Sequence, residues 1–184
     1  MIDETINWLK AHPRFFPQDL IKCETILDHL KAPNITNKLF FHPGHLTASA
    51  MILSPNRKQI LLIYHSAFQA WIQPGGHLDP SDQTPLETAK REVAEECMLY
   101  ETKLLLAYPS LLQVDIHDVP ANTTKGHPAH QHYDLRFAFV AQTLDIQAAS
   151  DAKAAQWVSI DDFDPTQSDS SVTESVHRLK GLLA

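Results

Sequence analysis

Three glutamates lie close together in the stretch Arg91-Glu92-Val93-Ala94-Glu95-Glu96. Glu92, Glu95 and Glu96 are spaced i, i+3 and i+4, so a helix would carry all three on one face. Like charges at this spacing repel one another, and a divalent cation would offset the repulsion. Carboxylate oxygens suit hard ions such as Mg²⁺ and Mn²⁺. The spacing leaves two interpretations open, a metal site and a solvent-exposed acidic face of a good helix-forming sequence.

A glycine turn precedes the acidic stretch. Gly75 and Gly76 follow Trp71-Ile72-Gln73-Pro74. Glycine lets the backbone approach a neighbour closely and adopt positive φ. A backbone carbonyl of this turn could therefore ligate the same ion as the glutamates, which favours the metal interpretation.

The residues between the turn and the glutamates predict the start of a helix. Thr84 can cap with its hydroxyl, Pro85 suits the first helical position, and Glu87 completes a capping box. No Gly or Pro follows until after Met98. A stripe facing the core is predicted from the helical spacing of the apolar residues Leu86, Ala89, Val93 and Cys97.

The combination of Gly76 with Arg91-Glu92-Val93-x-Glu95-Glu96 resembles the Nudix box of the Nudix hydrolases. The family pattern is Gly, five residues, Glu, seven residues, then Arg-Glu-apolar-x-Glu-Glu-x-Gly-apolar. The box is identified over Gly76 to Leu99, and the Pro-Gly-Gly lead-in agrees with it. The match covers a short part of the chain, while the surrounding layout of strands and helices is also similar to the family.

The chain departs from the family pattern in three ways. The spacing from Gly76 to Arg91 is one residue longer. The first Glu of the box is replaced by Asp82, or by Gln83 if the extra residue lies earlier. Met98 stands where the late Gly belongs. The Arg-Glu-x-x-Glu-Glu core that would bind metal is intact.

The resemblance implies hydrolysis of a diphosphate linkage, in a nucleoside diphosphate joined to a further group or in a similar small phosphorylated metabolite. It also implies Mg²⁺ or Mn²⁺ as cofactor. Glu92, Glu95, Glu96 and the Gly75 carbonyl would hold the ions. Arg91 would orient the carboxylates rather than touch the substrate.

The proton acceptor stays open at this level. One of the box glutamates, or an acid outside the box such as Asp151, would deprotonate the attacking water. The competing class is a catalytically weak sensor module that binds a nucleotide or a nucleotide sugar. The intact Arg-Glu-x-x-Glu-Glu favours an enzyme over a sensor.

Two further segments carry polar residues at every second position, namely Asp115 and His117 in one, and His130, His132, Asp134 and Arg136 in the other. If both are strands, each set lies on one face, and the two strands could pair as a hairpin. The polar face is then a solvated sheet surface, a wall that binds substrate phosphate or base, or a separate transition-metal site. The substrate-wall interpretation selects His117, His130, His132 and Arg136.

The remaining pattern predicts an α/β domain with a helical extension before it. Two helices broken at His12-Pro13 and Phe16-Pro17 make residues 1–36 an extension that packs on the domain or forms a dimer contact. The domain itself is expected over 37–184. The resemblance implies a Nudix-like α/β/α sandwich with a mixed central sheet. Strands are expected at 46–54 and 59–65, with one or two more within 102–116 and another that ends at 137–141. A short strand followed by a turn is expected at 156–163, and a final helix over 170–183.

Composition narrows the function classes. A chain of 184 residues fits one domain with one sizeable core. The net charge of −7 argues against nonspecific nucleic-acid binding. The resemblance to the Nudix hydrolases implies a small nucleotide or diphosphate as the partner. The sequence shows no signal peptide and no long apolar run, so we expect a cytoplasmic protein that does not bind membranes. Dimers are common among relatives, which leaves a homodimer open.

Overall fold

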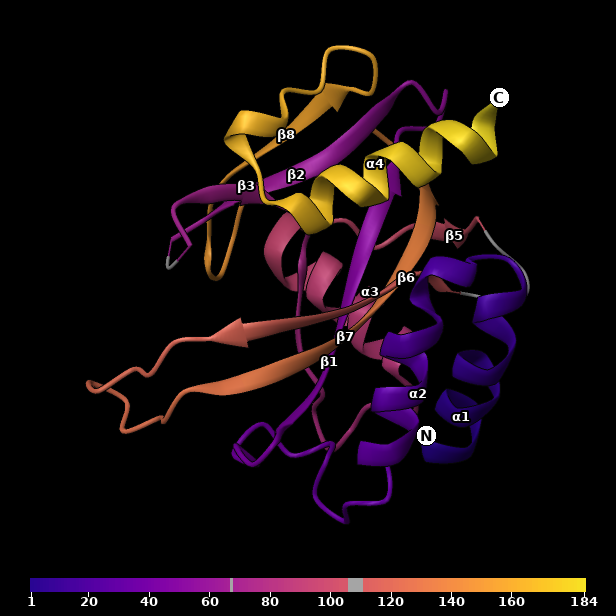
Figure 1. Ribbon diagram of the computed structural model, residues 1–184. Coiled ribbons are helices and arrows are strands. Elements are labelled where there is room, and N and C mark those ends of the chain that lie inside the picture. The colour runs from indigo at the N-terminus through magenta and orange to yellow at the C-terminus, as the bar shows by residue number, and fades with distance from the viewer. Residues whose placement is uncertain (67, 106–110) are drawn as a thin grey trace.

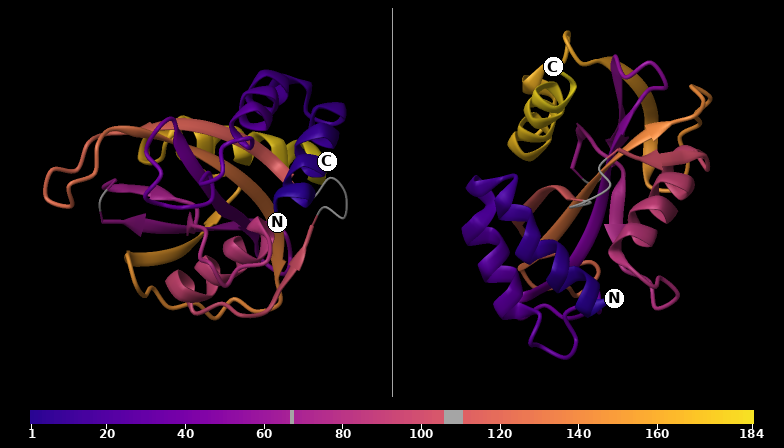
Figure 2. Two further views of the ribbon diagram at one scale, coloured as in Figure 1. Left: turned by 90° about the horizontal axis from the view of Figure 1, so that it is seen from below. Right: turned by 90° about the vertical axis from the view of Figure 1, so that its right-hand side faces the viewer.

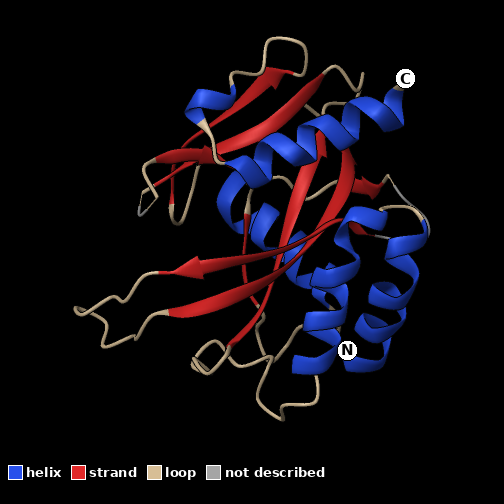
Figure 3. Cartoon of the chain, in the orientation of Figure 1, coloured by secondary structure: helices blue, strands red, loops and turns tan. Residues whose placement is uncertain are grey.

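The computed structural model describes residues 1–66, 68–105 and 111–184 and shows a mixed sheet flanked by helices (Figures 1 and 3). The α-helices are α1 (Ile2–Ala11), α2 (Leu20–His29), α3 (Pro85–Cys97) and α4 (Ser170–Leu183). The short 3-10 helices are η1 (His12–Arg14), η2 (Pro17–Asp19) and η3 (Pro165–Gln167). The strands are β1 (Gly44–Leu53), β2 (Gln59–His65), β3 (Ala70–Ile72), β4 (Gly75–His77), β5 (Thr102–Leu104), β6 (Leu111–Val119), β7 (His130–Ala141) and β8 (Ala152–Ser159).

Strand β1 is the centre of the sheet. It pairs in parallel with β7 along its whole length, and on its other edge it changes partner. The end of β1 pairs with β2 at Ile52 and Leu53, whereas its middle pairs with β4, with Thr47 opposite His77 and Ser49 opposite Gly75. The change of partner brings the glycine turn against the middle of β1.

Helices cover both sides of the sheet. Figure 2 shows α3 and α4 on opposite sides of the strands. The apolar residues of α3, among them Ala89 and Val93, share a buried cluster with Ala48 and Ile52 of β1. The apolar stripe of α4 joins a second cluster that includes Met51. The predicted layered α/β/α arrangement with a mixed sheet is confirmed.

The N-terminal helices are part of the same core as the sheet. Trp8 meets the ring of Phe137 edge-on, with the ring centroids 5.3 Å apart. Leu9 and Ile26 are fully buried in the cluster that also contains the apolar residues of α3. Both helices lie on the same side of the sheet as α4 (Figure 2). The extension thus packs on the domain, which is one of its two predicted roles, while the dimer contact stays a prediction.

The predicted hairpin is formed by β6 and β7. The two strands pair antiparallel, with Asp115 opposite Asp134 and His117 opposite His132, and they extend away from the rest of the sheet (Figure 1). The polar residues at every second position therefore share one face, as their spacing predicts. Within the residues described, no helix is both long enough and apolar enough to cross a membrane.

Helix α3 begins and ends where the sequence predicts. Its first cap differs from a capping box in the amide that Glu87 binds, and its last cap has Met98 in a left-handed conformation. The Thr84 hydroxyl accepts a hydrogen bond from the Glu87 amide at 3.2 Å. The Glu87 carboxylate accepts from the Gln83 amide at 2.7 Å, one residue before its capping-box position. Met98 ends the helix in the left-handed region, with φ of 54°, and its amide donates to the Ala94 carbonyl.

Met98→Gly should stabilise the protein by about 1 kcal/mol. A residue with a Cβ is strained in the left-handed conformation, and glycine removes that strain, although it also raises the entropy of the unfolded chain. The Met98 side chain is 45% exposed, so its removal costs little packing. Denaturant unfolding would measure the change. Met98→Ala keeps the Cβ and is the matched control. The prediction would be contradicted if Met98→Ala were as stable as Met98→Gly or more stable.

Candidate active site

The glycine turn and the acidic face of α3 are in direct contact. The Gly75 amide donates a hydrogen bond to Glu96 Oε2 at 3.0 Å. A Cβ placed on Gly76 would lie 2.5 Å from Glu92 Oε1, and one on Gly75 would lie 2.4 Å from Ser49 Cβ. Position 75 therefore needs glycine, because a Cβ there would also meet the backbone of β1, whereas a Cβ on Gly76 would displace only the end of the Glu92 side chain. The predicted turn is part of the short strand β4, and neither glycine adopts positive φ.

Arg91 holds the acidic face together. Its guanidinium donates to Glu92 Oε1 at 2.9 Å, to Glu95 Oε2 at 3.1 Å and to the His77 carbonyl at 2.8 Å. It also bonds the Asp82 carboxylate, with the shortest distance at 3.0 Å. Asp82 thus takes the place of the first acidic residue of the box, which decides between it and Gln83. The extra residue of the box lies between Asp82 and Arg91.

Burial changes the acidity of two of the glutamates. Glu96 is 3% exposed, and burial raises its pKa to about 8, although the Gly75 hydrogen bond acts in the opposite direction. Burial also raises the pKa of Glu92, although Arg91 lowers it in part. Clustered carboxyl groups with raised pKa values are suited to bind a hard divalent cation, because the cation would stabilise their charged forms.

The carboxylates face a large cavity. Its volume is about 890 Å³, and its lining includes Gly75, Arg91, Glu92, Glu95 and Glu96. Asp151, directly before β8, also lines it, and its charge contributes to the raised pKa of Glu96. The sequence-predicted outside base therefore lies at the same cavity as the box.

Another wall of the cavity comes from the β6–β7 hairpin, with His117, His130 and His132 in the lining. His117 Nδ1 lies 3.2 Å from Asp115 Oδ2, and Lys22 of α2 donates to the other oxygen of Asp115 at 3.1 Å. Burial alone would lower the pKa of His117, but the Asp115 hydrogen bond raises it above its ordinary value. The imidazole of His117 is thus biased toward its positively charged form.

Arg136 lies beneath this wall and is 1% exposed. Its guanidinium donates to Ser49 Oγ at 3.1 Å, to Ser175 Oγ at 2.8 Å and to Asp134 Oδ2 at 3.2 Å. Asp134 also accepts hydrogen bonds from Thr47 and Ser49. These protein groups hold the guanidinium of Arg136 in place, and Arg136 also belongs to the lining of the large cavity.

Sequence reasoning missed two imidazoles of this site, His45 and His77. His45 is the second residue of β1 and lies opposite His132, and His77 ends β4 directly after Gly76. A signal for His45 exists, because His45, Thr47 and Ser49 are polar residues at every second position of an otherwise apolar strand. His77 carries no local signal beyond its place next to Gly76.

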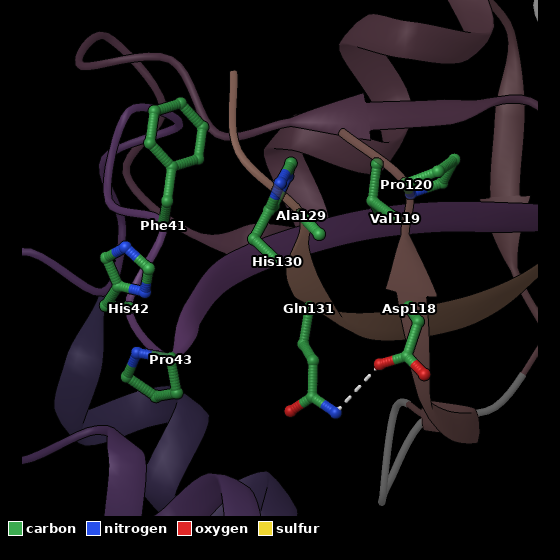
Figure 4. Close-up of a pocket in the computed structure, with 9 residues that line it drawn as sticks. All are labelled: Phe41, His42, Pro43, Asp118, Val119, Pro120, Ala129, His130 and Gln131. Atoms are coloured by element: carbon green, nitrogen blue, oxygen red, sulfur yellow. Dashed lines mark hydrogen bonds between the residues drawn. The ribbon is translucent and has the colours of Figure 1, made fainter. Parts of the chain in front are cut away.

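A second cavity of about 520 Å³ lies at the outer end of the hairpin (Figure 4). Phe41 and Pro43 form one side, and Gln131 donates to Asp118 Oδ1 at 3.1 Å on the other. His130 lines both cavities. The box carboxylates line only the larger cavity, so we place the chemistry there.

Comparisons with known proteins agree with this geometry. A family model described as NUDIX domain matches residues 43–179. A protein of Lactococcus lactis subsp. cremoris named "Probable DHNTP pyrophosphohydrolase" is 30% identical over 104 residues, which make up 56% of this chain and 58% of that protein. The chain thus spans less than two thirds of the length of this curated relative.

Solved structures show the same fold. A NUDIX-family hydrolase from Clostridium perfringens has a TM-score of 0.61 at 19% identity, covering 75% of this chain and 97% of that one. An Ap4A hydrolase from C. elegans has a TM-score of 0.55 at 16% identity, covering 75% and 96%. At such identities the likeness concerns the fold alone. Together with the match over residues 43–179, the fold and the box geometry show that this chain belongs to the NUDIX (Nudix hydrolase) family.

Proposed function

We propose that this chain is a metal-dependent pyrophosphohydrolase that cleaves a diphosphate linkage in a nucleoside diphosphate joined to a further group, or in a similar small phosphorylated metabolite. The observation that carries the proposal is the contact of Gly75 with the buried Glu96 and of Gly76 with the partly buried Glu92. Arg91 ties the same face to Asp82. The family generally uses divalent metal ions.

The carboxylates of Glu92, Glu95 and Glu96 would hold Mg²⁺ or Mn²⁺, with the Gly75 carbonyl as a backbone ligand. A bound ion would neutralise diphosphate charge and lower the pKa of coordinated water. Arg91 fixes the side chains of Glu92 and Glu95, which lowers the cost of arranging them around an ion.

Proton removal from the attacking water falls to an acid of the same cavity. The box glutamates Glu92, Glu95 and Glu96 are candidates for this role, because all three line the cavity. Asp151 is the alternative from outside the box. Asp151 lines the same cavity from the segment just before β8, and its charge contributes to the raised pKa of Glu96.

Substrate contacts come from the hairpin wall, where imidazoles can donate hydrogen bonds to phosphate oxygens. We assign this contact to His117, His130 and His132. The name of the Lactococcus relative adds DHNTP to the nucleotides worth testing.

The test is a product-release screen of the full chain with Mg²⁺ or Mn²⁺. The panel holds nucleoside triphosphates, DHNTP, ADP-ribose, nucleotide sugars and dinucleoside polyphosphates, with Glu96→Gln as the blank. Turnover that is absent from the blank supports the proposal. Ligand-induced thermal stabilisation without turnover would favour a nucleotide- or nucleotide-sugar-binding sensor instead.

Replacing a wall histidine should weaken substrate binding more than turnover. For His117→Ala and His130→Ala we expect KM to rise about tenfold or more, because a hydrogen bond to a charged group contributes about 1.5–3 kcal/mol. Steady-state kinetics on the substrate found in the screen would measure the change. His177→Ala on the exposed face of α4 is the matched control. An unchanged KM in both wall variants would remove these residues from the site.

A further inference from the structure

Three imidazoles meet where β1, β4 and β7 lie side by side. His45 is opposite His132 across the β1–β7 pair, and His77 lies opposite Thr47 on the other edge of β1. One nitrogen of each ring lies within 4.8 Å of a nitrogen of the other two. The ring centroids of His45 and His132 are 4.7 Å apart, and each lies 5.1 Å from that of His77.

His45 has a nitrogen with no evident role in the fold. The residue is 0% exposed, and its Nδ1 lies 3.0 Å from the Phe40 carbonyl, which can only accept a hydrogen bond. Nδ1 therefore carries the proton, and Nε2 presents a lone pair. Nε2 is buried and has no hydrogen-bond partner among the described residues. A buried polar atom of this kind is costly unless something binds it.

We propose that His45, His77 and His132 form a second metal site, for a transition-metal ion of the Zn²⁺ class, separate from the carboxylate site on α3. Imidazole nitrogen is a preferred ligand of such ions, whereas Mg²⁺ takes oxygen. A ligating histidine commonly donates its other ring N–H to a backbone carbonyl, which is the arrangement of His45 and Phe40.

The distances allow such a site with small side-chain movements. Tetrahedral Zn²⁺ with Zn–N bonds of about 2.0–2.1 Å places its ligand nitrogens about 3.4 Å apart. The observed nitrogens lie within 4.8 Å, so the rings must turn inward to close around an ion. His77 is exposed at the end of β4, where its ring can turn while the pairing with Thr47 holds its backbone.

The open side of the site faces the large cavity. His77 and His132 line that cavity, while the fully buried His45 lies behind them. An ion held by three imidazoles keeps a fourth position for water or a ligand atom, as catalytic Zn²⁺ sites do. The fourth position would thus be available to a molecule in the same cavity as the carboxylates. His130 Nε2 lies 3.2 Å from His132 Nε2 and must exchange this contact when His132 binds the ion.

The experiment is a Co²⁺ titration of the chelator-treated full chain, followed by visible absorption of the ion and by its displacement with Zn²⁺. Excess Mg²⁺ keeps the carboxylates of α3 occupied. We expect one Co²⁺ per chain with the strong visible bands of a tetrahedral nitrogen site. His77→Ala and His132→Ala should weaken Co²⁺ binding more than about 100-fold. Losing a residue that only hydrogen-bonds to a metal ligand usually costs less than this. The exposed His177→Ala is the control.

Two further variants separate this site from the proposed activity. Glu96→Gln should keep Co²⁺ binding while losing turnover, whatever the substrate. His77 is exposed, so His77→Ala tests the site even if the buried His45→Ala fails to fold. The proposal is overturned if Co²⁺ does not bind stoichiometrically. It is also overturned if His77→Ala and His132→Ala bind as well as the parent chain, or if Glu96→Gln abolishes the Co²⁺ bands.

Discussion

Glu96→Gln should lower kcat about 10³-fold while leaving the fold intact. Glu96 Oε2 accepts from the Gly75 amide at the point where the turn meets α3, so the residue joins the two halves of the box. The amide of glutamine fills the same space but carries no charge for a cation and is not a base. Loss of a group that accepts a proton costs about 10²–10⁴-fold. Steady-state kinetics on the substrate from the screen would measure the loss.

The same change should stabilise the protein when divalent ions are absent. The pKa of Glu96 is raised from 4.5 to about 8 by burial. The folded state therefore binds this proton more tightly than the unfolded state, and the corresponding stability is lost as pH rises from about 4.5 to about 8. Glutamine does not ionise, so the stability advantage of Glu96→Gln should grow across this pH range.

Unfolding midpoints with chelator at several pH values would measure this effect. Adding Mg²⁺ should raise the midpoint of the parent chain more than that of Glu96→Gln, because ligand binding stabilises the folded state. Glu24→Gln, at an exposed position of α2, is the matched control and should change neither activity nor the pH dependence. Retained turnover in Glu96→Gln would remove this residue from the proposed mechanism.

Local sequence signals predicted helix α3, which carries the carboxylates, and the hairpin that carries the wall histidines. The start of α3 follows from Thr84 and Pro85, whose effects act within one helical turn. The hairpin follows from the alternation of polar residues around His117 and His132, because side chains in a strand alternate between faces. Both signals involve neighbours in the chain, so they can be read without knowing the fold.

The contacts between distant segments could not be predicted in this way. The choice between Asp82 and Gln83 depended on how the longer loop folds back to Arg91. The meeting of His45, His77 and His132 depends on β1 pairing with both β4 and β7. The burial that sets the pKa of Glu96 arises from the same packing. A single sequence specifies these pairings only through the whole fold.

The contacts of Asp19 also could not be predicted from the sequence, because they join three distant parts of the chain. Its carboxylate accepts from both terminal nitrogens of Arg178 on α4, at 2.6 and 2.8 Å. It also accepts from the Val114 amide of β6 at 3.1 Å, and it bonds His12 Nε2 at 2.7 Å. Asp19 is 1% exposed, so solvent does not screen these contacts. The first helices, the hairpin and the last helix are thus tied together at one carboxylate.

Asp19→Asn should lower the free energy of unfolding by about 3–5 kcal/mol, because breaking a buried ion pair leaves the Arg178 charge without its main partner. Burial alone would raise the pKa of Asp19, but the Arg178 and His12 hydrogen bonds hold it well below 3.8. This stabilisation is present above the unfolded pKa and is lost as pH falls toward the folded one. The difference between parent and variant should therefore be full at pH 7 and shrink below about pH 4. Denaturant unfolding at pH 7 and below about pH 4 would measure this difference, and Asp28→Asn at an exposed position is the control. Equal stability of Asp19→Asn and the parent chain at pH 7 would show that the first helices are not held to the domain through this carboxylate.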